Sequence, residues 1–234
     1  MSLVYWVYRA DLQCKVQVEH WDGTVLDINA TCDDLGAKCL QLLGMHAMTG
    51  CDITSYPYGK GKVSALKTLL DGDYPGLADV LGEVDATQTE VMQAGEPFFT
   101  ALYGQSPGTS MESARFSLFT KKRRNPKLMT LPPTTANLLH HTLRAHLQVM
   151  LWKAENNQKP PSESNDITNF GWEFRDNIPT PCIFMGDPAP PQLLDVIRCN
   201  CKAQQRYSTE GCSCHKERLS CTSYCSCFEG DWVF

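Results

Sequence analysis

The sequence predicts an α/β fold at the front of the chain, then a mostly helical region and a small irregular tail. Strand-like segments come first, segments with apolar residues at helical spacing follow, and the end of the chain is dense in cysteine. A chain of 234 residues can bury one substantial core and carry a small appended module. We expect an α/β region at 1–82, a helical region at 83–158, a linker with short strands at 159–198 and a cysteine-rich module at 199–227.

The strand predictions rest on apolar runs and on alternation. Residues 3–8 form a continuous apolar run that suits a buried strand, and 14–20 alternate Val16 and Val18 with polar neighbours. Asp22-Gly23 is a turn signal, so we expect another strand at 24–28.

Helical spacing starts near Thr31, which together with Asp34 resembles a capping box. The apolar positions continue to about His46, and Gly50 is placed to stop the helix. Further helices are expected at 63–70, 75–81, 87–103, 110–121 and 134–155.

Charge is distributed unevenly along a mildly acidic chain. Residues 71–113 contain eight acidic residues and no Lys or Arg, whereas 115–127 contain six basic residues and no acid. Such asymmetry is typical of a nucleic-acid or targeting surface, and equally of a solvated helix end. No apolar stretch suits a membrane span, and 1–9 lack the features of a secretory signal, so we expect a reducing location in nucleus or cytoplasm.

The tail is the most specific chemical signal. In a reducing compartment, a dense cysteine run favours metal-bound thiolates over disulfides, although free or oxidised thiols are the alternative. Zinc prefers four thiolates in structural sites, so seven cysteines are one short of two independent sites unless a ligand is shared or His215 supplies an eighth. The expected zinc ligands are Cys199, Cys201, Cys212, Cys214, Cys221, Cys225 and Cys227.

A second motif lies at 46–62, where a helix is expected to end and place Asp52 at the mouth of a loop. Gly59 and Gly61 allow close backbone approach, and Lys60 and Lys62 stand beside the start of the next helix. This arrangement suits a phosphate group, and a simple turn into a helix is the alternative.

The run containing Gly50-Cys51-Asp52 resembles flap-endonuclease-type (PIN-like) nucleases, in which the Asp helps to hold Mg²⁺ or Mn²⁺ and the glycine-rich turn binds the DNA backbone. The whole chain is also similar to mobile-element-derived animal proteins with a cysteine-rich tail. That similarity is carried by Leu131-Pro-Pro-Thr134, His141, Arg144-Ala145, Trp152, Gly171-Trp172 and the Cys-x-Cys tail.

The sequence departs from these families in two places. PIN-like relatives carry an Asp-x-Asp motif where this chain has Met1 and Ser2. The tail resembles tesmin-like CXC modules, which use nine cysteines for three zinc ions. This chain has Tyr207 where a further cysteine is expected. The resemblance therefore implies a partial PIN-like domain, with Asp52 as a vestigial metal ligand, and a tail that holds two ions.

Other candidate sites are weaker. His140, His141 and His146 lack the His-Glu-x-x-His pattern of metalloproteases and suit core or surface positions. Cys32 and Cys39 share an apolar helix face and are most simply buried.

These features favour a zinc-binding, nucleic-acid-associated protein with an incomplete nuclease-like domain of mobile-element origin. DNA is the expected partner. Two alternatives remain: a metal-dependent, structure-specific nuclease that uses Asp52, and a protein-interaction module based on the tail.

Overall fold

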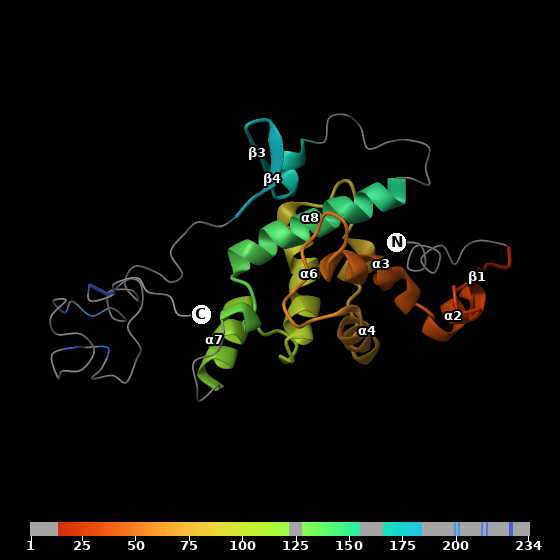
Figure 1. Cartoon of the computed structure of the whole chain (residues 1–234), viewed down its shortest axis with the longest axis horizontal. Helices are drawn as coiled ribbons and strands as arrows, with labels where there is room; N and C mark the ends of the chain where they lie inside the picture. The colour runs from red at the N-terminus through yellow and green to blue at the C-terminus, as the bar shows by residue number, and fades with distance from the viewer. Residues whose placement is uncertain are drawn as a thin grey trace. The chain divides into compact units, whose positions relative to one another are not determined.

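The structure is a computed structural model that describes residues 14–121, 128–154 and 166–183, and six tail residues (199, 201, 212, 214, 225 and 226). The chain divides into two compact units, Met1–Phe184 and Met185–Phe234. In the first unit helices dominate, and the described strands form two antiparallel pairs (Figure 1). The predicted mixture of helices and strands is confirmed, whereas the described residues contain no parallel sheet. The predicted strand at 3–8 lies outside the described residues.

The first hairpin pairs β1 (Gln17–Glu19) with β2 (Val25–Asp27), so that Val18 lies opposite Leu26. Gly23 makes the turn with φ +81°, a left-handed conformation that glycine adopts without steric cost. β1 falls within the segment predicted from alternation, and β2 falls within the one predicted from the turn signal at Asp22-Gly23.

The predicted helix from Thr31 to Gly50 is two helices, α2 (Ile28–Leu35) and α3 (Lys38–Met48). The capping prediction for Thr31 was wrong: the N-cap is Asp27, which is extended and accepts from Ala30 N–H at 3.1 Å. Gly36, with φ +53°, ends α2.

The remaining helices begin and end close to the predicted positions. Gly61 precedes α4, and Thr87 caps α6 in a reciprocal capping box with Glu90. Within the described part of the chain, no helix is both long and apolar enough to cross a membrane. The helices are α4 (Lys62–Asp71), α5 (Gly76–Asp79), α6 (Gln88–Leu102), α7 (Met111–Lys121) and α8 (Thr135–Ala154), with a short 3₁₀ turn at Leu128–Thr130.

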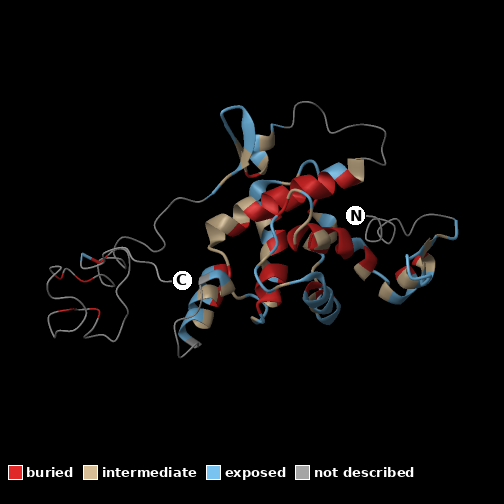
Figure 2. Cartoon of the chain, viewed as in Figure 1, coloured by how far each residue is buried: buried red, intermediate tan, exposed pale blue. Residues whose placement is uncertain are grey.

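The core lies where α3 packs against α4, α5 and α8, and where α6 packs against α8. Met48, Leu77, Phe98 and Leu138 are almost completely buried there. Figure 2 shows the buried residues concentrated on α3, α6 and α8.

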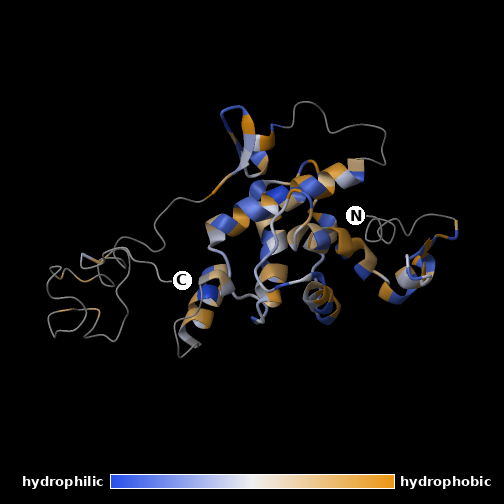
Figure 3. Cartoon of the chain, viewed as in Figure 1, coloured by the Kyte–Doolittle hydropathy of each residue, from blue (hydrophilic) through white to orange (hydrophobic). Residues whose placement is uncertain are grey.

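Helix α8 is buried around much of its circumference yet rich in hydrophilic residues, as Figures 2 and 3 show together. Several of its buried polar groups have partners within the protein, whereas Nδ1 of His140 is buried without a hydrogen-bond partner among the described residues. His141 Nε2 lies 2.8 Å from the Met48 carbonyl, and His146 Nδ1 accepts from Gly82 N–H at 3.0 Å. Arg144 donates to the Gly171 carbonyl at 2.9 Å. His141 and His146 therefore join α8 to neighbouring elements, and both occupy core positions, one of the two placements expected of the histidines.

A second hairpin follows a 3₁₀ turn at Ile167–Phe170 and pairs β3 (Trp172–Arg175) with β4 (Ile178–Pro181). Asp176 and Asn177 both have positive φ, as a two-residue type I′ turn requires. Arg144 holds this hairpin to α8 through the bond to Gly171.

Candidate metal centre

Five of the seven expected ligands are described, and all five thiols are buried. Among the described tail residues, one buried cluster is made of cysteine alone: Cys199, Cys201, Cys212, Cys214 and Cys225. Such a cluster has little hydrophobic surface of its own, and a bound ion could stabilise it.

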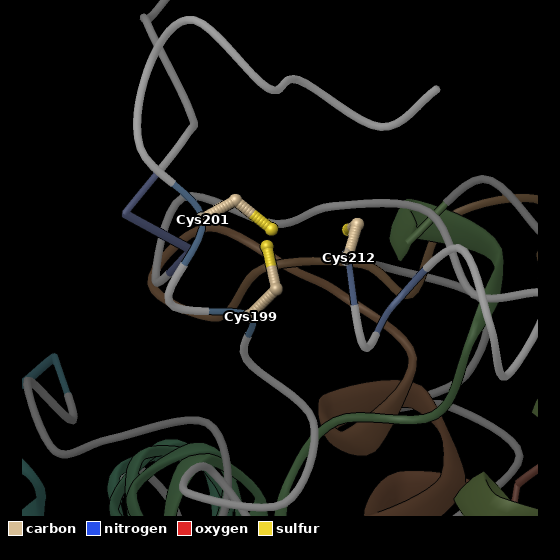
Figure 4. Close-up of side chains that lie close together, drawn as sticks. All are labelled: Cys199, Cys201 and Cys212. Carbon is tan, nitrogen blue, oxygen red and sulfur yellow. The ribbon is translucent and has the colours of Figure 1, made fainter. Parts of the chain in front are cut away.

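The sulfurs form two groups of three. In each group, every sulfur lies within 4.8 Å of the other two: Cys199, Cys201 and Cys212 in one group, Cys199, Cys214 and Cys225 in the other. Figure 4 shows the first group, with the sulfurs of Cys199 and Cys201 pointing toward one another. The cysteines are therefore positioned to hold a metal ion.

The spacing of the sulfurs fits tetrahedral coordination. A zinc–sulfur bond of about 2.3 Å places two ligands of one tetrahedral ion about 3.8 Å apart. The sulfurs of Cys214 and Cys225 are 3.6 Å apart. The donor set consists of soft thiolates, which zinc accepts and which Mg²⁺ and Ca²⁺ avoid.

Backbone hydrogen bonds tie the first and last described cysteines together. Cys199 N–H points to the Cys225 sulfur at 3.5 Å, and Ser226 N–H donates to the Cys199 carbonyl at 3.1 Å. These bonds join positions 26 and 27 residues apart in the chain. An N–H group directed at a cysteine sulfur stabilises the thiolate form that a metal requires.

Burial is the main cause of raised pKa values at two thiols of the cluster. Burial, with hydrogen bonds to Cys199 and Cys212, raises the pKa of Cys201 to about 12. Burial and the neighbouring Cys225 raise the pKa of Cys214 to about 12. A metal must therefore displace protons from these thiols, so its affinity falls as the solution becomes more acidic.

The other expected ligands, Cys221 and Cys227, and the candidate eighth ligand His215 lie outside the described residues. Their roles as zinc ligands stay predictions.

In the loop at 46–62, Lys62 contacts the end of the preceding helix. Its Nζ lies 2.6 Å from the His46 carbonyl, 2.9 Å from Thr49 Oγ1 and 2.5 Å from the Gly50 carbonyl. The residue as a whole is exposed, but its ammonium group is used to cap α3. A phosphate bound by Lys62 would compete with these three acceptors.

The other loop residues are placed differently. Lys60 Nζ lies 5.0 Å from the centre of the Tyr103 ring, a cation–π contact. Gly59 has φ +69°, and Gly61 is the N-cap of α4 without a side chain to cap its N–H groups. An uncapped helix start leaves N–H donors for an anion. Phosphate binding by these four residues stays a prediction.

Asp52 is exposed at the start of the same loop, which Thr54 fixes by donating to the Ala47 carbonyl at 2.7 Å. Among the described residues, no group of three metal-ligating side chains includes Asp52. Among the described residues, the groups of three side chains that could hold a metal ion are the two cysteine groups. In the described part of the chain, the tail cysteines therefore lie close together, whereas Asp52 belongs to no cluster of carboxylates.

Two features of these sites could not be predicted in full from the sequence. Spacing alone does not tell which cysteine belongs to both sulfur groups, although the shortage of one ligand implied that one is shared. The capping role of Lys62 depends on a long side chain reaching back 12 to 16 residues, which no local pattern records.

Compared with known protein families, with curated proteins and with solved structures, the chain shows no match.

Proposed function

We propose that this chain is a zinc-binding, nucleic-acid-associated protein whose C-terminal cysteines hold structural zinc. The observation that carries the proposal is the pair of three-sulfur groups with every sulfur within 4.8 Å of its group members. Zinc is the divalent ion that most commonly takes all-thiolate tetrahedral sites in structural modules. Clustered thiolates of this kind persist in a reducing compartment, so a location in nucleus or cytoplasm is part of the proposal.

The zinc content of the full chain tests this proposal. Protein purified under reducing, chelator-free conditions should contain about two zinc ions per chain, because zinc takes four ligands and the tail offers seven cysteines. The zinc should be released by a thiol-modifying reagent. Purified protein that lacks bound zinc and takes up none when it is added would refute the proposal.

Nucleic-acid association rests on the turn before α4. The N-cap Gly61 leaves the first-turn N–H groups without a side-chain acceptor, and Lys60 supplies a cation one residue earlier. A helix N-terminus beside a lysine attracts a phosphate, so the sequence-independent backbone of duplex DNA is the proposed ligand. An incomplete nuclease-like domain is part of the same proposal and rests on the resemblance at 50–52. A mobile-element origin is also part of it and rests on the similarity of the whole chain, carried by Leu131-Pro-Pro-Thr134, His141, Arg144-Ala145, Trp152, Gly171-Trp172 and the Cys-x-Cys tail.

Binding of duplex DNA as a function of salt tests this second part. Lys60→Ala should weaken binding and reduce the steepness with which affinity falls with salt, because fewer counterions are released. Lys67→Ala on the exposed side of α4 is the matched control and should change the salt slope less. Equal slopes in the two variants would show that the loop is only a turn.

A further inference from the structure

We infer that the free edge of β3 pairs with the same edge of a second copy of this chain, so that two hairpins join into one antiparallel sheet of four strands. Among the described residues, the hairpin of β3 and β4 is a sheet of two strands only. Figure 1 shows it as a separate element outside the helical core. A sheet of two strands is marginally stable in water, and additional strands stabilise it. This inference is independent of the proposed binding of zinc and nucleic acid.

The register of the hairpin shows which backbone groups point to the open edge of β3. Cys182 N–H donates to the Gly171 carbonyl at 2.9 Å, so these two residues form a hydrogen-bonded pair. Bonded and non-bonded pairs alternate along an antiparallel ladder, and Phe174, which lies opposite Pro179, therefore belongs to a non-bonded pair. The N–H and C=O of Phe174 thus point away from β4, and no other described residue forms a hydrogen bond with them.

Proline makes the two edges of the hairpin different. On β4, Pro179 and Pro181 occupy the positions whose backbone groups point outward, and proline has no N–H to donate. Prolines at these positions block the addition of a strand on the β4 side. On β3, the corresponding positions are Trp172 and Phe174, which keep their N–H groups. The edge of β3 is therefore the one that can accept another strand.

The side chains of β3 are complementary to those of a second β3. In an antiparallel pair centred on Phe174, the two Phe174 residues lie opposite each other and Glu173 lies opposite the partner's Arg175. Opposite charges then face each other twice, and cross-strand pairs of opposite charges and of aromatic rings stabilise a sheet. Within one chain, Arg175 Nη2 lies 2.6 Å from Glu173 Oε1, so both side chains lie on the same face of the strand. Phe174 is 55% exposed and can contact a partner.

Sedimentation equilibrium of the full chain at several concentrations measures this association. The mass should rise from 26.2 kDa toward twice that value as the concentration increases. Phe174→Pro should raise the dimer dissociation constant about tenfold or more, because it removes the two central hydrogen bonds and leaves the bonds to β4 intact. Ile178→Ala, at an exposed position on β4, is the matched control and should change the constant much less. A chain that stays monomeric at every concentration would overturn the inference.

Exchange of charges tests whether the partner is a second β3. Glu173→Arg and Arg175→Glu should each be monomeric at concentrations where the original chain is dimeric, because like charges then face each other. A one-to-one mixture of these two variants should associate again, since every charge in one variant then faces the opposite charge in the other. Circular dichroism of each variant checks that the helices are retained. A dimer that persists in either variant alone, or a mixture that stays monomeric, would show that β3 does not pair with its copy.

Discussion

Lys62 connects two helices through one ammonium group. It belongs to the first turn of α4, yet its Nζ contacts the last carbonyls of α3. Burial lowers the pKa of Lys62 to about 8. The three oxygen acceptors offset part of the cost of burying the charge, and a cation at a helix C-terminus is favourable.

We therefore expect Lys62→Met to lower the free energy of unfolding by about 1–2 kcal/mol, since it removes hydrogen bonds from a charged donor and the cap of α3. The measurement is chemical denaturation followed by circular dichroism. Lys67→Met, on an exposed part of the same helix, is the control and should change stability by less than about 0.5 kcal/mol. Equal effects of the two substitutions would contradict the capping role.

Two buried histidines make stability depend on pH. Burial lowers the pKa of His141 and of His146 from 6.5 to about 4. Between these values the unfolded chain binds protons that the folded chain does not, so acid favours unfolding. The stabilisation is complete above about pH 6.5 and is lost as pH falls toward 4.

We expect the free energy of unfolding to fall by about 1 kcal/mol per histidine between about pH 7 and about pH 5.5. His146→Asn keeps an acceptor for Gly82 N–H and removes one titrating group, so its pH dependence should be shallower than that of the unsubstituted chain. Denaturation at several pH values measures the slope. An unchanged slope in the variant would show that His146 titrates normally in the folded protein.

At the scale of elements, α3 and α5 approach each other closely at Gly44. A Cβ added there would clash with the Leu77 carbonyl oxygen and lie 3.0 Å from Leu77 Cβ. Alanine would otherwise favour the helix over glycine by about 1 kcal/mol. For Gly44→Ala, helix propensity alone predicts a gain in stability, whereas the close contact with Leu77 predicts a loss.

We expect Gly44→Ala to destabilise the protein by about 1–3 kcal/mol, because the carbonyl is backbone and cannot move aside easily. Thermal unfolding measures the change. Gln93→Ala, at an exposed position on α6, provides the comparison for helix propensity. A Gly44→Ala protein that is more stable than the original would mean that α3 and α5 separate without cost.

The helices were largely predictable because their ends carry local signals. Thr87 caps α6, and Gly50, with φ +102°, follows the end of α3. The break between α2 and α3 was missed, because Leu35, Cys39 and Leu42 keep helical spacing across it. The burial of polar groups on α8 was only partly foreseen, since their partners come from distant elements such as Met48 and Gly82.

For the metal centre, sequence predicted the ligand type and the shortage of one ligand. It did not predict which sulfur is common to both groups, because a Cys-x-Cys spacing fixes neither the direction of a side chain nor the path between the pairs. The sequence likewise did not predict how close Asp52 lies to other acidic side chains, because carboxylate clusters form from residues distant in the chain.

At the scale of the whole molecule, the two units should respond differently to removal of metal. The first unit has a hydrophobic core, whereas the described part of the second is a cluster of cysteines. A strong zinc chelator should therefore remove protection from proteolysis in 199–227 and leave the helical circular dichroism and its thermal transition nearly unchanged. Loss of the helical transition together with zinc would show that the first unit depends on the metal.

We also expect the chain to show no metal-dependent cleavage of flap or single-stranded DNA with Mg²⁺ or Mn²⁺. Two divalent ions close together need several converging carboxylates, and among the described residues Asp52 belongs to no group of three ligands. Asp52→Ala protein, purified in parallel, serves as the control for contaminating nuclease. Cleavage that disappears in this variant would establish the nuclease alternative.

X-ray absorption at the zinc edge tests the central claim most directly, because it reports the atoms bound to the metal in the intact protein. We predict a first shell dominated by sulfur at about 2.3 Å, the distance of a zinc–thiolate bond. The two cysteine groups, with sulfurs within 4.8 Å of one another, provide such ligands. A first shell made of nitrogen and oxygen at about 2.0–2.1 Å would show that the metal is bound elsewhere in the chain and would contradict the account.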